Sequence, residues 1–120
     1  MLENVILVEK STVPIGTFKM ILGIIDATSI KNNRDKYVIA SNPEFLAEGT
    51  AVKDLMKPDR VILGAAEDKD IIRLSTLYEY VGKERIIYTN NASAELSKLA
   101  ANCFLAQRVS SINSMAIICE

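Results

Sequence analysis

The carboxyl-terminal quarter of the sequence is its most constraining feature. From about Ala92 to Glu120 there is neither proline nor glycine, and residues that favour helices dominate. The run predicts one α-helix of about 29 residues, which would span roughly 43 Å. Apolar residues lie around much of its circumference: Leu96, Leu99, Ala100, Cys103 and Phe104 on one side, and Leu105, Val109, Ile112 and Ile117 on others. Such a helix must be covered by further protein. Because the pattern still runs at Glu120, we expect the chain to be a fragment.

Upstream of this helix, short apolar runs alternate with segments of helical pattern. Strands are predicted at 5–8, 37–40, 60–63 and 85–88. Helices are predicted at 14–27, from a cap at Asn42 through Pro43 to Gly49, and from about 68 to 81. The stripe of the last helix is Ile71, Ile72, Leu74, Leu77, Tyr78 and Val81. Residues 28–36 are expected to form a polar surface loop. The alternation predicts an α/β fold with a mainly parallel sheet.

Composition excludes several classes of function. With 49% hydrophobic and 24% charged residues and a formal charge of -1, the chain has neither a disordered composition nor a basic surface for nucleic acid. No apolar run approaches the roughly 18 residues of a membrane span, so we expect no membrane partner and a cytoplasmic location. Histidine is absent, and Cys103 and Cys119 do not have metal-ligand spacing. We expect both cysteines to be small buried residues.

Two polar clusters follow predicted strands, where ligands bind in open α/β sheets. Ser11 and Thr12 follow the first strand, and Asn42, Pro43 and Glu44 follow the second. The ordinary interpretation makes Thr12 a capping hydroxyl and Glu44 a carboxylate that complements a helix dipole. Glu48 lies four residues after Glu44, so both would share one helix face. Paired carboxylates sometimes mark a site with a raised pKa, although solvated surface glutamates are commoner.

A third cluster lies on the long helix. Glu95, Lys98 and Asn102 follow one another at i, i+3 and i+7, which places them on one stripe. An ammonium group and an amide one turn apart could hold the same ligand oxygen and stabilise negative charge there. The competing interpretation is a surface ion pair between Glu95 and Lys98.

Together the three clusters resemble the UDP-glucose/GDP-mannose dehydrogenase family. The run Glu9-Lys10-Ser11-Thr12-Val13-Pro14 is similar to its strand-to-helix turn. The run Asn42-Pro43-Glu44-Phe45-Leu46-Ala47-Glu48-Gly49-Thr50 resembles its sugar-nucleotide loop, and Pro58-Asp59-Arg60-Val61 follows at the expected spacing. The stretch from Glu95 to Ser114 resembles the start of its central helix. The resemblance covers nearly the whole chain in the family's order.

The resemblance implies an NAD-dependent enzyme that oxidises the C6 alcohol of UDP-glucose to a carboxylate in two steps through a cysteine thioester. Thr12 would hold the reacting water and border NAD together with Ser11 and Val13. Glu44 would act in acid/base catalysis. The substrate would be lined by Glu44, Phe45, Leu46, Ala47 and Glu48, with Glu48 also near the nicotinamide ribose. Lys98 and Asn102 would hold the C6 oxygen and stabilise oxyanions. The central helix implies a homo-oligomer.

The departures from the family pattern concern parts that the sequence does not contain. No G-x-G-x-x-G follows a strand, and the family's catalytic cysteine would lie beyond the long helix. We therefore expect residues 1–90 to be the C-terminal portion of a Rossmann-like NAD-binding domain and residues 91–120 to begin a central helical domain. Alone, the chain should be inactive, and a role only in assembly is the alternative. Relatives that act on GDP-mannose or UDP-N-acetylmannosamine share the Ser-Thr-Val-Pro turn, although the other runs look more like UDP-glucose enzymes of eukaryotic type.

Overall fold

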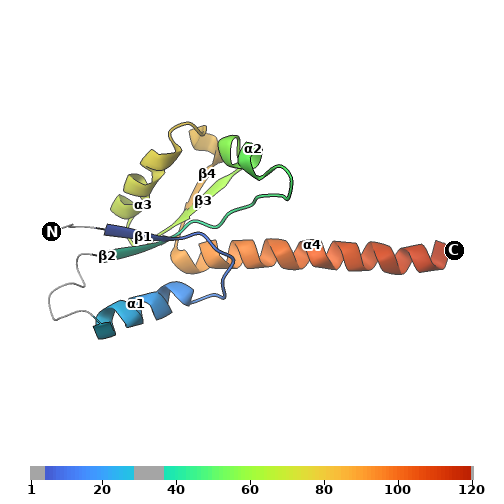
Figure 1. Cartoon of the computed structure of the whole chain (residues 1–120), viewed down its shortest axis with the longest axis horizontal. Helices are drawn as coiled ribbons and strands as arrows, with labels where there is room; N and C mark the ends of the chain where they lie inside the picture. The colour runs from blue at the N-terminus through green and yellow to red at the C-terminus, as the bar shows by residue number, and fades with distance from the viewer. Residues whose placement is uncertain (1–4, 29–36, 120) are drawn as a thin grey trace.

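The computed structural model describes residues 5–28 and 37–119, which form an α/β arrangement. The expected loop at 28–36 therefore lies, apart from Thr28, outside the described residues. The elements in chain order are β1 (Val5–Glu9), α1 (Thr17–Thr28), β2 (Tyr37–Ser41), α2 (Ala51–Met56), β3 (Val61–Gly64), α3 (Asp68–Ser75), β4 (Ile86–Thr89) and α4 (Asn91–Cys119), with short 3-10 turns at Thr76–Tyr78 and Lys83–Arg85. The predicted fold class, an α/β domain portion followed by a long helix, is confirmed (Figure 1).

The sheet is mixed, with strand order β1-β2-β3-β4. β1 pairs with β2 in parallel, and β3 pairs with β4 in parallel. β2 and β3 instead meet in antiparallel orientation at Ser41 and Gly64. The expectation of a mainly parallel sheet holds for the outer pairs: α1 (12 residues, about 18 Å) connects β1 to β2, and α3 with the two 3-10 turns connects β3 to β4. α2 has six residues and spans only about 9 Å, too little to return the chain in the same way.

The apolar core lies between the sheet and α3. Its buried residues are Ala40, Val61, Leu63, Ala65, Ile71, Leu74, Tyr78 and Val81, and Ile6 and Ile86 pack against them. Two members of the predicted stripe, Ile72 and Leu77, are instead 65% and 67% exposed. The helix ends at Ser75 and continues as a 3-10 turn, so a stripe drawn for one helix through Val81 does not hold.

α1 and α4 lie on the sheet face opposite α3 (Figure 1). α4 packs closely against β3, since a Cβ added at Gly64 would come within 2.7 Å of both the Ala94 Cβ and the Asn90 carbonyl oxygen. The buried Asn91 side chain donates to the Ile39 carbonyl at 3.1 Å and to the Gly64 carbonyl at 3.4 Å. This amide joins the start of α4 to both central strands.

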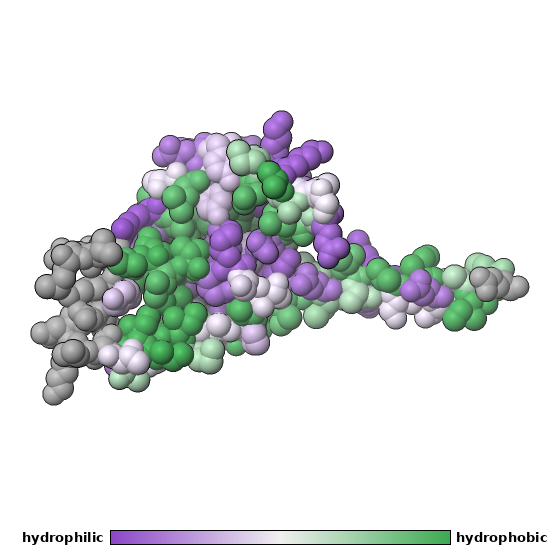
Figure 2. Space-filling view, viewed as in Figure 1, coloured by the Kyte–Doolittle hydropathy of each residue, from purple (hydrophilic) through white to green (hydrophobic). Residues whose placement is uncertain are grey.

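α4 extends far beyond the body formed by the other elements (Figure 1). The molecule measures 66 × 33 × 23 Å, and its radius of gyration is 17.8 Å. A compact chain of this length would have a radius of about 14 Å. Residues 102–119 are all exposed, and Figure 2 shows hydrophobic groups along this arm. Cys103 and Cys119 are exposed free thiols, so the prediction that they are buried was wrong. None of the helices in the described ranges is long and apolar enough to cross a membrane.

Candidate functional site

A cavity of about 310 Å³ opens where the strands end, between the sheet and α2. Its wall comes from the end of β1, the segment after β2, α2 and the residues that lead into β3. The lining residues are Lys10, Asn42, Pro43, Glu44, Phe45, Leu46, Ala47, Asp54, Leu55, Lys57, Pro58, Asp59, Arg60, Val61 and Tyr78. Both charge signs face the cavity, so a ligand that carries anionic and hydroxyl groups would meet donors and acceptors together.

The segment after β2 is irregular rather than helical, so the prediction of a helix capped by Asn42 was wrong. The Asn42 side chain instead makes hydrogen bonds in the interior. Its oxygen accepts hydrogen bonds from the Lys10 ammonium at 2.9 Å and from the Tyr78 hydroxyl, and its amide donates to the Ile62 carbonyl at 2.9 Å. The Asn42 backbone amide donates to the Glu9 carbonyl at 2.8 Å. These contacts hold the segment against the sheet in an extended path, and the helix begins only at Ala51.

Glu44 and Glu48 therefore do not share a helix face. Both side chains are exposed, Glu44 lines the cavity, and Glu48 lies in the turn before α2, outside the cavity lining. The predicted carboxylate pair one helical turn apart is corrected to two glutamates on a loop.

Phe45 brings two cations from distant parts of the sequence together. The Arg60 guanidinium carbon lies 4.6 Å from the centre of the Phe45 ring, and the Lys98 ammonium nitrogen lies 5.2 Å from it. Both distances lie within the range of cation–π attraction. Lys98 is half-buried, so α4 contributes a positive charge beside the segment that follows β2. Asn102, one turn further along α4, is exposed.

Beyond Lys10, the residues of the turn after β1 are not among those that line the cavity. Ser11 and Thr12 are exposed, and Val13 is half-buried. The structure therefore gathers Glu44, Phe45, Leu46 and Ala47 in the cavity wall, with Lys98 against the Phe45 ring, whereas Ser11, Thr12, Val13, Glu48 and Asn102 are not among the lining residues.

Glu95 does not form the surface ion pair with Lys98 that spacing allowed. It is only 2% exposed, and its oxygens accept hydrogen bonds from the backbone amides of Gly16 at 2.6 Å and Phe18 at 2.8 Å. Glu9 lies close by. Burial and then the charge of Glu95 raise the pKa of the Glu9 carboxyl, and one oxygen of Glu9 is buried without a hydrogen-bond partner.

Asp54 fixes the turn between the extended segment and α2. It accepts hydrogen bonds from the Thr50 hydroxyl at 2.8 Å and the Ala47 amide at 3.1 Å. The Thr50 bond, followed by the Ala47 bond, lowers the pKa of Asp54. Asp54, Lys10 and Arg60 were not predicted as site residues. The spacing of Thr50 and Asp54 could have indicated the first, but no local pattern indicates the contacts of the others.

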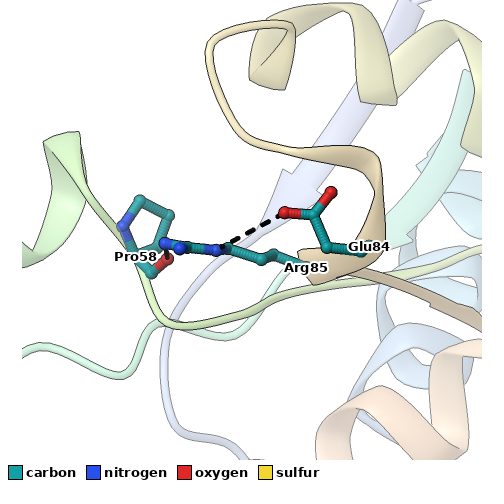
Figure 3. Close-up of polar contacts among 3 residues, drawn as sticks. All are labelled: Pro58, Glu84 and Arg85. Carbon is teal, nitrogen blue, oxygen red and sulfur yellow. Dashed lines mark hydrogen bonds and ion pairs between the residues drawn. The ribbon is translucent and has the colours of Figure 1, made fainter.

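The segment that leads into β3 is also held by Arg85, which directly precedes β4. Arg85 donates to the Pro58 carbonyl at 3.3 Å, and its guanidinium lies 3.7 Å from a Glu84 carboxylate oxygen (Figure 3). Both side chains are largely exposed, so the ion pair itself contributes little to stability. The Arg85 contact with Pro58 keeps that part of the wall beside β4.

Ligands of open α/β sheets bind beyond the carboxyl ends of parallel strands, and this cavity opens at the carboxyl ends of β1 and β2. Comparison with known families identifies the class of enzyme. Residues 1–82 match the model described as UDP-glucose/GDP-mannose dehydrogenase family, NAD binding domain, and residues 92–120 match the central domain of the same family. The chain belongs to the UDP-glucose/GDP-mannose dehydrogenase family.

Individual relatives agree with this assignment. The chain is 54% identical over 120 residues to UDP-glucose 6-dehydrogenase 1 of Glycine max and to UDP-glucose 6-dehydrogenase of Gallus gallus, in each case over 96% of this chain and 24% of the relative. It thus spans about a quarter of the length of the curated relatives it matches.

Solved structures show the same fold. A UDP-glucose dehydrogenase from Pyrobaculum islandicum superimposes with a TM-score of 0.81 at 37% identity, over 92% of this chain and 25% of that one. A GDP-mannose dehydrogenase from Pseudomonas aeruginosa gives 0.79 at 28% identity, over 93% and 26%.

Proposed function

We propose that this chain is part of an NAD-dependent UDP-glucose 6-dehydrogenase that converts UDP-glucose to UDP-glucuronate by two successive oxidations through a cysteine thioester. The observation that carries the proposal is the contact between Phe45 in the strand-end segment and Lys98 on α4. It joins two of the sequence runs that resemble the family, since Phe45 lines the cavity and Lys98 lies against its ring. Residues 1–90 are proposed as the C-terminal portion of the NAD-binding domain and residues 91–120 as the start of the central domain.

Each proposed site residue is given the role that the family resemblance implies. Glu44, Phe45, Leu46, Ala47 and Glu48 line the nucleotide sugar, and Glu44 serves as an acid/base group for thioester hydrolysis. Lys98 and Asn102 hold the C6 oxygen and stabilise negative charge on it, which a half-buried ammonium group does better than a solvated one. Thr12 holds the reacting water.

Ser11, Thr12 and Val13, with Glu48, border the NAD cofactor, which accepts the hydride in each oxidation. The exposed hydroxyls of Ser11 and Thr12 at the end of β1 fit a neighbouring cofactor. The first amides of α1 do not fit its pyrophosphate, because Glu95 already accepts from Gly16 and Phe18. The residues of this chain therefore border the nicotinamide end rather than the phosphates.

The test is NAD reduction by the whole protein that carries this chain, with UDP-glucose, GDP-mannose and UDP-N-acetylmannosamine compared in parallel. We expect UDP-glucose to be preferred, and preference for another sugar would replace this substrate. Lys98→Met should lower kcat by about 100-fold or more, since one oxyanion donor contributes on that scale. Lys69→Met is the matched control, because Lys69 pairs with Glu67 on the exposed surface at the start of α3. The 120-residue chain by itself should not reduce NAD.

A second candidate is a role in assembly, which the exposed apolar side chains of α4 favour. We propose that the protein is a homo-oligomer whose subunits meet through this helix. We also propose a cytoplasmic location for the reaction, which cell fractionation would test. If the chain acts only in assembly, adding it to an active relative should change the activity of that enzyme without turnover of its own.

A further inference from the structure

The buried carboxylate of Glu95 joins two elements that lie almost 80 positions apart in the sequence. Its two oxygens each accept one backbone hydrogen bond, from Gly16 at 2.6 Å and from Phe18 at 2.8 Å. Other amides at the start of α1 have backbone partners: Thr17 donates to the Pro14 carbonyl, and Lys19 and Met20 donate to the Gly16 carbonyl. Glu95 therefore supplies the acceptors that the first turn of a helix cannot provide for itself.

The two hydrogen bonds to the Glu95 carboxylate are expected to be stronger than ordinary backbone hydrogen bonds. Hydrogen bonds to a carboxylate are shorter and stronger than those between neutral groups, and negative charge is favoured at a helix N-terminus. Glu95 is nevertheless buried beside the Glu9 carboxyl, a like charge that opposes this position. A side chain held there against repulsion, with both oxygens engaged by another element, fixes the distance between α4 and the start of α1.

The turn that carries Thr12 is held at both of its ends. At the β1 end, the Glu9 carbonyl accepts from the Asn42 backbone amide at 2.8 Å and the Lys10 ammonium donates to the Asn42 side chain at 2.9 Å. At the α1 end, Glu95 holds Gly16 and Phe18. On α4, Glu95 lies on the same stripe as Lys98 and Asn102, at i, i+3 and i+7.

We propose that Glu95 is a positioning residue, which fixes the turn carrying Thr12 relative to Lys98 and Asn102 so that both parts of the site keep one geometry. The effect on turnover rests on the proposed function, whereas the effect on the turn does not. Glu95 need not touch substrate or cofactor for this role, since it acts through the backbone amides that it holds.

The first test is amide hydrogen exchange, followed by NMR, in the chain with Glu95→Gln. Glutamine keeps the size of the side chain but offers one acceptor oxygen instead of two. Exchange at Gly16 or Phe18 should therefore become about tenfold faster or more, because a hydrogen bond to a charged group is lost. Exchange at Ile39 and Leu63, in the buried strands, should stay unchanged. Glu79→Gln, at an exposed glutamate, is the matched control and should alter none of these amides.

The second test measures kinetics in the whole protein that carries the chain. Glu95→Gln should lower kcat about tenfold and leave KM for UDP-glucose within about twofold, because most of the residues proposed to line the nucleotide sugar belong to the segment after β2, whereas Glu95 holds Gly16 and Phe18. A uniform rise in exchange at all amides, or an unchanged kcat, would overturn the positioning role. If the unsubstituted protein shows no turnover, the proposed function fails, while local exchange at Gly16 and Phe18 still decides whether Glu95 holds the turn.

Discussion

At the scale of single residues, the buried amide of Asn42 connects three parts of the cavity wall. It joins Lys10 at the end of β1, Tyr78 after α3 and the backbone of β3 through Ile62. A buried polar group stabilises a fold only when its hydrogen bonds are made, and here both ends of the side chain are engaged. The cost of removing it is therefore mainly the cost of the partners left without a bond.

Asn42→Ala should lower the free energy of unfolding by about 2–3 kcal/mol, since the Ile62 carbonyl loses its donor and the Tyr78 hydroxyl loses its acceptor in the interior. Tyr78→Phe removes the hydrogen bond to Asn42 and a longer one that the Tyr78 hydroxyl accepts from Lys10 at 3.3 Å, but it leaves Lys10 on the Asn42 oxygen, so it should cost only about 1 kcal/mol. Urea denaturation of both variants measures the difference. Equal losses would show that the network does not depend on the amide.

The carboxyl of Glu9 gives a pH dependence whose sign follows from its environment. Its pKa is raised above the ordinary 4.5 in the folded chain, so folding favours the protonated form. The stabilising contribution is complete below 4.5 and is lost as the pH rises through the raised pKa. Glu9→Gln cannot ionise, so it should be more stable than the unsubstituted chain at neutral pH, and the difference should vanish well below 4.5. Thermal melts across this range check it, and an advantage that persists in acid would contradict it.

The sequence predicts the site residues unevenly. Spacing places Lys98 and Asn102 on one stripe of α4. Local spacing does not show which other element packs against that stripe. A glutamate three residues before a lysine can pair with it or reach another element, and Glu95 reaches α1. For Asn42, the motif Asn-Pro-Glu is typical of a helix start, but buried partners from β1 and β3 outweigh that local preference. The site roles themselves remain predictions.

At the scale of elements, the contact of α4 with β3 depends on the absence of a side chain at Gly64. Ala94 and the Asn90 carbonyl occupy the space that a Cβ would need. Both neighbours are parts of the first turns of α4 and its cap, so neither can move without moving the helix. The backbone of Gly64 also accepts from Asn91, and that bond requires the same close approach.

Gly64→Ala should therefore destabilise the chain by about 1–3 kcal/mol, the range seen when a well-packed interior is overfilled. Gly23→Ala is the control, for which we expect the opposite effect on stability. Gly23 lies within α1 with nothing near the position of a Cβ, so alanine should stabilise the helix by up to about 1 kcal/mol. Denaturation midpoints of both variants test this pair. A neutral Gly64→Ala would mean that α4 can shift away from β3 without loss.

Element positions are predicted well wherever hydrophobic pattern and packing agree. Each predicted strand overlaps the observed one with ends within one residue, and the long helix begins at Asn91 instead of about Ala92. The helix predicted from Pro14 begins at Thr17, because residues 14–16 form a turn in which Gly16 has a φ of 94°. The antiparallel β2–β3 junction was not predicted, since strand alternation alone does not specify whether a short helix can complete a parallel crossover.

At the scale of the whole molecule, the exposed half of α4 carries seven exposed large apolar side chains on a single element. Phe104, Val109 and Ile112 are 65%, 51% and 66% exposed on the arm shown in Figure 2. Water contact with so many apolar side chains is unfavourable, and a helix of this kind is stabilised mainly by packing. Association through the arm would cover this surface.

The chain should therefore form oligomers as its concentration rises. Val109→Lys combined with Ile112→Lys should return it to a monomer of 13.2 kDa, because two charges would enter the apolar contact. Light scattering gives the mass, and circular dichroism should show that the fold of the body is kept. Lys19→Ala, at an exposed position of α1 away from the arm, serves as the control. A mass that stays monomeric without substitutions would exclude association through α4.

The close packing of α4 at Gly64 also makes that helix a lever with its pivot near one end. Suppose that the helix tilts by about 5° about Ala94, the residue in contact with β3. Lys98, about 6 Å along the axis, would move by roughly 0.5 Å, whereas Cys119, about 38 Å along, would move by roughly 3 Å. Residues near the pivot thus move little, whereas the far end of the helix moves several times as far. Because the proposed donors Lys98 and Asn102 lie within about 12 Å of the pivot along the axis, a displacement of the outer end of the arm, such as a bound partner would impose, reaches them strongly reduced.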